Sequence, residues 1–450
     1  MKKIVTFADK YRSFFIFIVV IAGFFVVMLD STVVNVALAS IGKNMHVSDS
    51  GLQWIINSYT LSMASTLLVC GSLCDRFGAH SVYTTGLIIF ALASLECSMA
   101  NKIVLLLVAR IIQGIGGACL IPASLALISK LAASSKQRAH FIGWWGASGG
   151  FAAATGPLLG GLLTSQFGWQ AIFYLNPPII AILLICLWIS WDTFKQQNEL
   201  KNSRFDWLGS ALITLVMIVC CFVASSWSVQ SALSVTLLMS VGIAALATFV
   251  IHEKRSRQPL LPLKLAKQTH FIFANIVGFS LNFSFFGELF ALTLYLQNQL
   301  GLSSIHTGFA VFPQTCSAII AAPLGGRYAS RWGNLRTMQV GLSIGCAGFT
   351  LMNLIDQNIS FTLIASFSFL ASFGMAFAVP AASNQAVSNA DDSEQGIASG
   401  VINTVRQFGT MMGIAMIGSL YTLNGIHAAL TTAALMFLLS LIIISVRKQQ

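Results

Sequence analysis

The sequence carries very little charge for its length. Lysine, arginine, aspartate and glutamate make up only 9% of the 450 residues, whereas 56% are hydrophobic and the mean hydropathy is +0.80. A water-soluble globular domain needs far more polar surface than this composition supplies. The composition therefore excludes a soluble protein and indicates an integral membrane protein.

The sequence also lacks the common signatures of nucleotide and metal chemistry. It contains no G-x-x-x-x-G-K-[ST] loop, which argues against a nucleotide-driven pump. Its nine cysteines have no spacing typical of metal sites or disulfides, and its seven histidines form no ligand cluster along the chain. We therefore expect no enzyme activity, no metal and no cofactor, and we expect any transport to be driven by an ion gradient.

What the chain does contain is a series of long apolar runs. Each is about 20 residues long, the length a helix needs to cross the hydrocarbon core of a bilayer. The runs are continuous rather than alternating, which favours helices over the strands of a membrane barrel. The sequence therefore predicts an all-α membrane protein with fourteen spans, at 14–38, 51–74, 81–100, 103–129, 139–164, 170–191, 206–226, 230–251, 271–297, 305–326, 336–355, 359–387, 396–420 and 426–446.

The distribution of basic residues tests this span count independently. With an even number of spans, both termini and alternate loops lie on one side of the membrane. Of the 25 lysines and arginines, only Lys43 and Lys102 fall in loops on the other side, and only Arg110 and Arg406 fall inside spans. Because basic loops stay in the cytoplasm, we expect both termini there. The net charge of +11 then reflects topology and contact with anionic lipid rather than nucleic acid.

One short loop pattern, a glycine, an arginine, an aromatic residue and a second glycine in the same order, occurs twice. GSLCDRFG at 71–78 follows the second span, and GRYASRWG at 326–333 follows the tenth, 255 positions later. Such repeats are typical of transporters whose two halves enclose a substrate site near the middle of the bilayer. We therefore predict a six-helix bundle at 1–192, two additional spans at 193–255, and a second six-helix bundle at 256–450.

Further motifs follow one another along the spans. The first span carries LDSTVVNVALAS, the fourth ARIIQGIGGA and the fifth TGPLLGG, while GSLCDRFGAH follows the second span and HEKRSRQPLLPLKL the eighth. Together, and over nearly the whole chain, these motifs resemble those of the fourteen-span drug:proton antiporters of the major facilitator superfamily. The matching positions are Asp30, Thr32, Asn35, Gly71, Asp75, Arg76, Gly78, Arg110, Gln113, Gly114, Gly156, Pro157, Gly160 and Gly161.

The resemblance implies a function and a set of roles. The protein would be a proton-coupled antiporter in the cell inner (plasma) membrane, exporting small amphipathic or lipophilic compounds by alternating access. Ala39, His80 and Ser330 depart from the family pattern, and Ser330 stands where the second gating loop often keeps an acid. The gating-loop positions are Gly71, Asp75, Arg76, Gly78, Arg327 and Arg331, and those of the antiporter motif are Gly156, Pro157, Gly160 and Gly161.

The expected partners follow from the same resemblance. They are a small-molecule substrate, protons and the lipid bilayer, and the chain is expected to act as a monomer. A periplasmic adaptor and an outer-membrane channel remain open as further partners. Lipophilic compounds, including monocations, suit the 33 phenylalanines and nine tryptophans together with the few membrane acids.

Proton coupling needs an ionisable group inside the membrane, and only three of the fourteen acidic residues lie in the interior of the expected spans. Asp30 lies deep in the first span and matches the family motif. Glu96 lies near the outer end of the third span, where a structural role is the simpler interpretation. Glu288 matches no motif. An ionised carboxylate in any of these places is costly unless it is partnered, which makes Asp30 and Glu288 candidates for proton binding.

The position of Glu288 is argued from helical spacing. Four phenylalanines between 279 and 290 recur at intervals of 4, 3 and 4, which places them on one face. Ser284, Glu288 and Tyr295 follow the opposite face. If the phenylalanines meet lipid or a neighbouring helix, Glu288 points into the bundle, where it would bind a proton or a cationic substrate. A purely structural role for Glu288 stays open.

Two arginines within spans also need partners. By resemblance Arg110 couples to the proton site, electrostatically through Asp30, with a structural clamp as the alternative. Arg406 shares a polar face with Asn403 and Thr410 and is a candidate for substrate contact or for closing the cavity. The residues expected at the substrate cavity are Asn35, Gln113, Ser284, Tyr295, Asn403 and Arg406.

Three other functions remain open from the sequence. They are a proton symporter that imports a small nutrient, an exporter of one endogenous metabolite or siderophore, and a sensor or assembly partner that has lost transport. The last would be expected to have lost Asp30, Arg110 and the gating loop, and all of these are present.

Overall fold

The computed structural model is a bundle of long helices. The residues that it describes are 7–131, 134–189, 206–226, 232–256, 260, 263–355, 360–388 and 395–446. In chain order the helices are α1 (Phe7–Met45), α2 (Asp49–Phe77), α3 (Ala79–Met99), α4 (Ile103–Leu131), α5 (Ser135–Phe167), α6 (Ala171–Tyr174), α7 (Asn176–Ile189), α9 (Trp207–Ser226), α10 (Ala232–Arg255), α11 (Leu263–Ala266), α12 (Thr269–Leu294), the π-helix η1 (Tyr295–Gln299), α13 (Ser304–Trp332), α14 (Asn334–Met352), α15 (Phe361–Val387) and α16 (Gln395–Val446).

By length and composition, ten helices in the described part of the chain can cross a membrane. The fourteen expected spans are therefore not all identified by this criterion. Helices α2, α5 and α14 fall outside it, because serine, glycine and amide side chains lower their hydropathy. Helix α16 is counted once although Gly425, with φ 80° and ψ −176°, interrupts its helical backbone.

The repeated loop sequence corresponds to a repeated structure. Helices α2 and α13 are each 29 residues long and begin 255 positions apart. Ser48 and Ser303 cap their N-termini, each accepting a hydrogen bond from the backbone N–H three residues later. Gly78 and Gly333 end them with φ of 85° and 88°, a left-handed conformation that favours glycine. The two segments are thus equivalent in backbone as well as in sequence.

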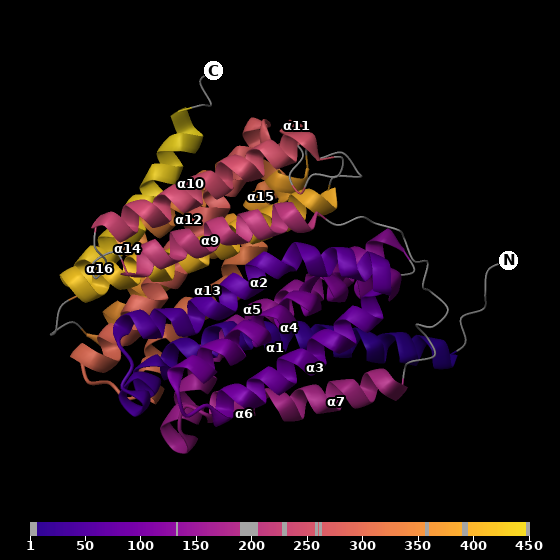
Figure 1. Cartoon of the computed structure of the whole chain (residues 1–450), viewed down its shortest axis with the longest axis horizontal. Helices are drawn as coiled ribbons and strands as arrows, with labels where there is room; N and C mark the ends of the chain where they lie inside the picture. Colours follow the sequence, from indigo (N-terminus) through magenta and orange to yellow (C-terminus); the bar gives the residue numbers. More distant parts are fainter. Residues whose placement is uncertain are drawn as a thin grey trace.

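The helices group into two halves that touch along two seams. In the first half α1 packs on α5, and α4 packs on α2 and α3; in the second, α12 packs on α16, and α15 packs on α13 and α14. Figure 1 shows the first half in the lower part of the view and the second half in the upper part, with most helix axes in a common direction. The seams between the halves are formed by α5 with α13 and by α2 with α16.

The two helices between the halves occupy a particular place. Helix α10 packs on α9, and α9 lies against both α2 and α16. A small apolar cluster joins the three elements, with Ala64 from α2, Met217 and Cys221 from α9, and Met411 and Ala415 from α16. Helix α9 therefore covers the seam between α2 and α16.

Candidate functional site

A closed polar network lies in the apolar interior of the first half. Asp30 in α1 and Arg110 in α4 form an ion pair, with 2.5 Å between Arg110 Nη1 and Asp30 Oδ2. Gln113 Nε2 and Asn176 Nδ2 donate to Asp30 Oδ1 at 2.9 and 3.0 Å, and both also donate to Ser94 Oγ. These five side chains are at most 1% exposed, so the network compensates its own charges.

Arg110 is held from every side. Its Nε donates to the carbonyl oxygen of Ile55 at 3.2 Å, and its Nη1 donates to Gln113 Oε1 at 2.7 Å. The guanidinium carbon lies 4.2 Å from the centre of the Tyr59 ring, a cation–π contact. Gly114 brings α4 close to α2, because a side chain there would collide with the Tyr59 carbonyl and the Ser62 hydroxyl. The arginine is thus fixed by α1, α2 and α4 together.

The second half contains a separate buried acid. Glu288 in α12 is fully buried, and Gln314 Nε2 in α13 donates to its Oε2 at 2.5 Å. In the described part of the chain neither Glu288 Oε1 nor Gln314 Oε1 has a hydrogen-bond partner. This pair is not part of the Asp30 network, and no described cation lies within ion-pair distance of Glu288.

A third polar group connects α12 and α16. Arg406 Nε donates to Asn282 Oδ1 at 3.3 Å, and Asn282 Nδ2 donates to Thr410 Oγ1 at 3.0 Å. Thr410 Oγ1 in turn donates to the backbone oxygen of Arg406 at 3.3 Å. Asn282 is thereby held with its oxygen toward the arginine, and Arg406 keeps part of its surface accessible.

The remaining residues expected at the substrate cavity share no hydrogen bond with one another among the described residues. Asn35 and Asn403 donate to carbonyl oxygens of their own helices. Ser284 donates to the Ala433 oxygen in α16 at 2.9 Å, and Tyr295 is buried in η1. Of the expected set, Gln113 belongs to the Asp30 network and Arg406 contacts Asn282.

The phenylalanine face of α12 is enclosed by protein at two of its four positions. Phe283 and Phe290 are at most 1% exposed, and Phe279 stacks on Phe283 and lies beside Phe408 of α16. The opposite face, with Ser284 and Glu288, also meets protein. Both faces are therefore packed against neighbouring helices, which is why spacing within α12 could not by itself identify a cavity.

The gating-loop residues lie at one end of the bundle. Arg76 and Arg331 are exposed, and each guanidinium lies over the ring of the next residue, Phe77 or Trp332, at 5.3 and 5.6 Å. Arg327 is exposed as well, and a side chain at Gly71 would have open space around it. The side chain of Asp75 lies outside the described residues, so the gating role of this loop stays a prediction.

The antiporter motif lies where helices approach closely. A Cβ at Gly160 would lie 2.5 Å from the Val33 oxygen of α1, and one at Gly156 would collide with Thr32. On the other side, a Cβ at Gly161 would lie 2.5 Å from the Ser304 oxygen of α13. The Pro157 oxygen approaches the place of a Cβ on Gly308 to 2.6 Å. The motif therefore joins α5 to α1 and also to the second half.

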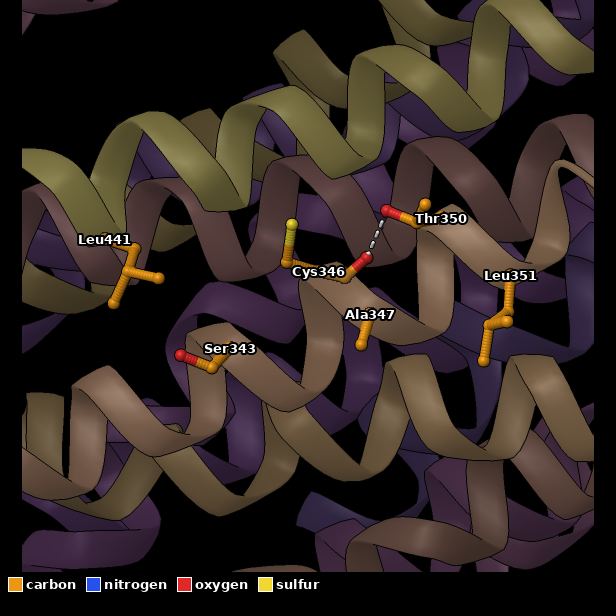
Figure 2. Close-up of a pocket in the computed structure, with 6 residues that line it drawn as sticks. All are labelled: Ser343, Cys346, Ala347, Thr350, Leu351 and Leu441. Carbon is orange, nitrogen blue, oxygen red and sulfur yellow. Dashed lines mark hydrogen bonds between the residues drawn. The ribbon is translucent and has the colours of Figure 1, made fainter.

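A groove of about 500 Å³ lies on the outer face of α14 and α16, away from these groups. Figure 2 shows its lining side chains along one face of α14 together with Leu441 of α16, and the bond from Thr350 to the Cys346 oxygen. No charged side chain lines the groove. It is an apolar surface of the kind that lipid tails cover, and it brings no reactive groups together.

Several residues of these sites were missed by sequence reasoning. Ser94 and Asn176 complete the shell of Asp30, Gln314 faces Glu288, and Asn282 faces Arg406. Each is a polar side chain in an apolar span, and that is the signal which could have singled them out. Serines and amides are common in the spans of this chain, so the signal alone does not say which partner each one meets.

Comparison with known proteins places the chain in a family. The sequence profile of the Major Facilitator Superfamily matches residues 20–414. The chain is 32% identical to the methylenomycin A resistance protein of Bacillus subtilis over 91% of its own length and 88% of that protein. It is also 32% identical to the drug efflux pump JefA of Mycobacterium tuberculosis, over 88% and 78% of the two chains.

A third relative and a solved structure agree with this placement. The tetracenomycin C resistance and export protein of Streptomyces glaucescens is 31% identical over 89% of this chain and 74% of its own. A POT family transporter solved with 5-aminolevulinic acid has the same fold, with a TM-score of 0.74 at 13% identity, covering 98% of this chain and 97% of its own. The chain therefore belongs to the major facilitator superfamily, as a multi-pass transporter of the plasma membrane whose relatives are drug-efflux and resistance proteins.

Proposed function

We propose that the protein is a proton-coupled antiporter that exports small amphipathic or lipophilic compounds by alternating access. Asp30, Arg110 and Glu288 couple the proton to transport in this proposal. The efflux and resistance relatives support the direction of transport. The surroundings of Glu288 carry the argument for the proton.

With Glu288 ionised, the Glu288–Gln314 pair lacks a hydrogen-bond donor for its two unpaired oxygens. An ionised Glu288 would have a single amide donor and no cation, and burying a charge in that way is costly. A proton on Glu288 removes the charge and provides a donor for Gln314 Oε1. Both unpaired oxygens would then take part in hydrogen bonds. The arrangement seen here is therefore the one that a protonated Glu288 stabilises.

The Asp30 network responds to a proton in the opposite way. Asp30 accepts three hydrogen bonds, one of them from the buried cation Arg110. A proton on Asp30 would abolish the ion pair and leave Arg110 without its anion. Protonation thus disfavours the present contact of α1 with α4 and favours that of α12 with α13. Differential binding of this kind is what links a proton to a conformational change.

The contacts between the halves support alternating access. At one end, Gly161 of α5 packs against Ser304 of α13, and Thr315 of α13 donates to the Ala154 oxygen at 2.9 Å. Nearer the gating loops, a Cβ added to Gly143 or Gly146 of α5 would meet no atom within 4 Å. The described contacts of α5 with α13 thus lie toward one end of α5, and rocking between states closed at one end or the other is how repeat-built transporters expose a central site.

The proposal includes the full topology. Fourteen spans arise when α2, α5 and α14 cross the membrane with the ten more apolar helices and Gly425 divides α16 into two crossings. The order is then a six-helix bundle at 1–192, α9 and α10 within 193–255, and a second bundle at 256–450. The basic loops place both termini in the cytoplasm.

Proton coupling is tested in everted membrane vesicles that carry the full-length protein. An imposed proton gradient should drive dye uptake, and an uncoupler should abolish it. Glu288→Gln keeps the shape and the contact with Gln314 but cannot exchange a proton, so uptake should lose its dependence on the gradient. The matched control is Glu96→Gln, because Glu96 is exposed at the end of α3.

Three results would contradict the mechanism. Wild-type uptake that persists with the uncoupler would exclude proton antiport, and a sodium requirement would replace the ion. Unchanged gradient dependence in Glu288→Gln would remove Glu288 from the mechanism. Binding of the dye to purified variants separates a coupling defect from loss of the substrate site.

Export of one particular compound is a second candidate. The relatives include proteins named for resistance to a single antibiotic, methylenomycin A or tetracenomycin C. A susceptibility screen with many unrelated compounds, in a host that lacks its own pumps, distinguishes the two. Protection against one chemical series alone would favour a dedicated exporter over a multidrug pump.

A further inference from the structure

Arg406 is a membrane-embedded cation with an incomplete set of partners. It lies in the middle of the first segment of α16, and among the described residues its side chain donates only to Asn282 Oδ1, through Nε. No described carboxylate lies within ion-pair distance. Arg110, by contrast, has Asp30 at 2.5 Å, the Ile55 carbonyl and two aromatic rings around it.

The residues around Arg406 leave room for its side chain and fix its orientation. A Cβ on Gly278 would lie 3.2 Å from Arg406 Cγ, so the glycine lets the arginine stem lie flat against α12. Asn282 cannot turn away, because its amide nitrogen donates to Thr410. With Nε engaged by Asn282, Nη1 and Nη2 have no acceptor among the described residues. These two nitrogens form the fork that binds a carboxylate in bidentate geometry.

Arg406 also lies at the level where the two halves meet. The next residue, Gln407, donates to Met63 Sδ of α2 at 4.0 Å, which places this turn of α16 at the boundary with the first half. Arg406 keeps part of its surface accessible, as do Phe279 and Phe408, whose rings are 5.7 Å apart. Phe279 directly follows Gly278, which the stem of Arg406 approaches, so an aromatic side chain adjoins the place where the arginine crosses α12.

We propose that Arg406 and Asn282 form an anion-binding site that holds the carboxylate of the transported compound. The apolar body of the compound then packs on Phe279, which follows Gly278 in α12. The substrate class is amphipathic organic acids, including zwitterions, and an organic cation is disfavoured by the charge of Arg406. The inference rests on the proposed export function and names the substrate class of that pump.

An arginine inside the membrane is stabilised by a nearby anion, which is the physical reason to expect a carboxylate at Arg406. Leaving a guanidinium in a low-dielectric interior without a counter-charge is costly, and an arriving carboxylate removes that cost. The Asp30–Arg110 pair is neutral overall, and Glu288 in the protonated form proposed above would add no charge to the interior. Arg406 is then the group that sets the sign of the charge that the substrate carries.

The test uses two dyes that differ only at the proposed contact. One is a rhodamine with a free carboxylate, and the other is its methyl ester. Uptake of each is measured in everted vesicles for wild type, Arg406→Gln, Arg406→Lys and the control Lys43→Gln, which removes a positive charge from an exposed position near the far end of α1.

Wild type should prefer the free acid. In Arg406→Gln, kcat/KM for the acid should fall about 10- to 100-fold, mainly through KM, which is the range that charge-assisted hydrogen bonds supply. The methyl ester should change less than about twofold, since it makes no ion pair. Arg406→Lys should recover part of the acid transport, and Lys43→Gln should match wild type.

An equal loss for acid and ester in Arg406→Gln, or a wild-type preference for the ester, would overturn the proposal in favour of a structural clamp between α12 and α16. Purified full-length protein gives an independent measurement. The acid should raise the melting temperature of wild type and not of Arg406→Gln, provided both variants are folded and monodisperse; Arg406→Lys serves if the glutamine variant is not. If the acid binds wild type but neither dye is pumped, the export function fails while the anion site stands. Equal stabilisation of both proteins by the acid would also exclude the site.

Discussion

Asp30 and Arg110 form a buried ion pair in which neither side chain is exposed to more than 1%. Pairs of this kind contribute little when intact, yet removing one partner leaves an uncompensated charge in the interior. The two residues should therefore behave very differently when changed singly and together.

Single variants should destabilise the protein strongly, and the double variant should recover. Asp30→Asn and Arg110→Gln are each expected to cost about 3 to 5 kcal/mol. The double variant removes both charges and keeps polar side chains at both positions, so much of this loss should disappear. Thermal melts of purified protein measure the coupling between the two changes.

The double variant should nevertheless fail to couple proton movement to transport. It folds without a titratable group at position 30, so gradient-driven uptake should be lost while substrate binding remains. Normal gradient-driven uptake by the double variant would show that the pair is structural only.

Helix α5 offers a matched pair of glycines, Gly160 inside the antiporter motif and Gly146 outside it. Gly160→Ala places a methyl group 2.5 Å from the Val33 oxygen, and overpacking of this kind costs about 1 to 3 kcal/mol. Gly146→Ala, also in α5, meets open space and should change stability by less than about 1 kcal/mol. Transport should fall with the first and persist with the second. Equal effects would mean that the close approach of α5 to α1 is not important.

The repeated loops predict equal costs at equivalent positions. Gly78 and Gly333 both have left-handed backbone, so alanine at either should cost about 1 to 2 kcal/mol. Gly71 and Gly326, also 255 positions apart, are helical with open space beside them, and alanine there should be neutral or slightly stabilising. Melting temperatures of the four variants test this. A large difference between Gly78→Ala and Gly333→Ala would break the equivalence.

The number of spans is tested by reporter fusions. Green fluorescent protein joined after Gln450 should fluoresce, and alkaline phosphatase at the same place should be inactive, because that end is expected in the cytoplasm. Fusions after Asn424, just before the break in α16 at Gly425, should give the reverse. The same result at both positions would mean that α16 crosses the membrane only once.

Much of the helix pattern could be predicted from sequence, because crossing a bilayer demands long apolar runs and these are written locally. The repeat at 71–78 and 326–333 likewise predicted the shared backbone of α2 and α13. Contacts between helices were harder. Asp30 with Arg110 could be suggested, since both lie in recognisable motifs. Asn176 reaches Asp30 across 146 positions, and nothing local in its sequence names that partner.

The two faces of α12 illustrate the remaining difficulty. Periodicity separates phenylalanines from Ser284 and Glu288, but it does not say what each face meets. In the structure Phe283 lies along α16, and Ser284 reaches the Ala433 oxygen on the later segment of the same helix. Because α16 turns at Gly425, it covers α12 from two sides. That arrangement depends on the tertiary fold and is not visible within α12.

The position of α9 makes the two seams of the transporter unequal for molecules that are already dissolved in the bilayer. Where α2 and α16 adjoin, helix α9 lies between their seam and the lipid. The apolar cluster around Met217 and Cys221 fills this seam, so a lipophilic compound diffusing within a leaflet would meet α9 there. On the opposite flank, the glycines of α5 nearest the gating loops have nothing beside them. If the protein exports lipophilic compounds as proposed, their entry from the lipid is expected at the α5 flank rather than beside α9.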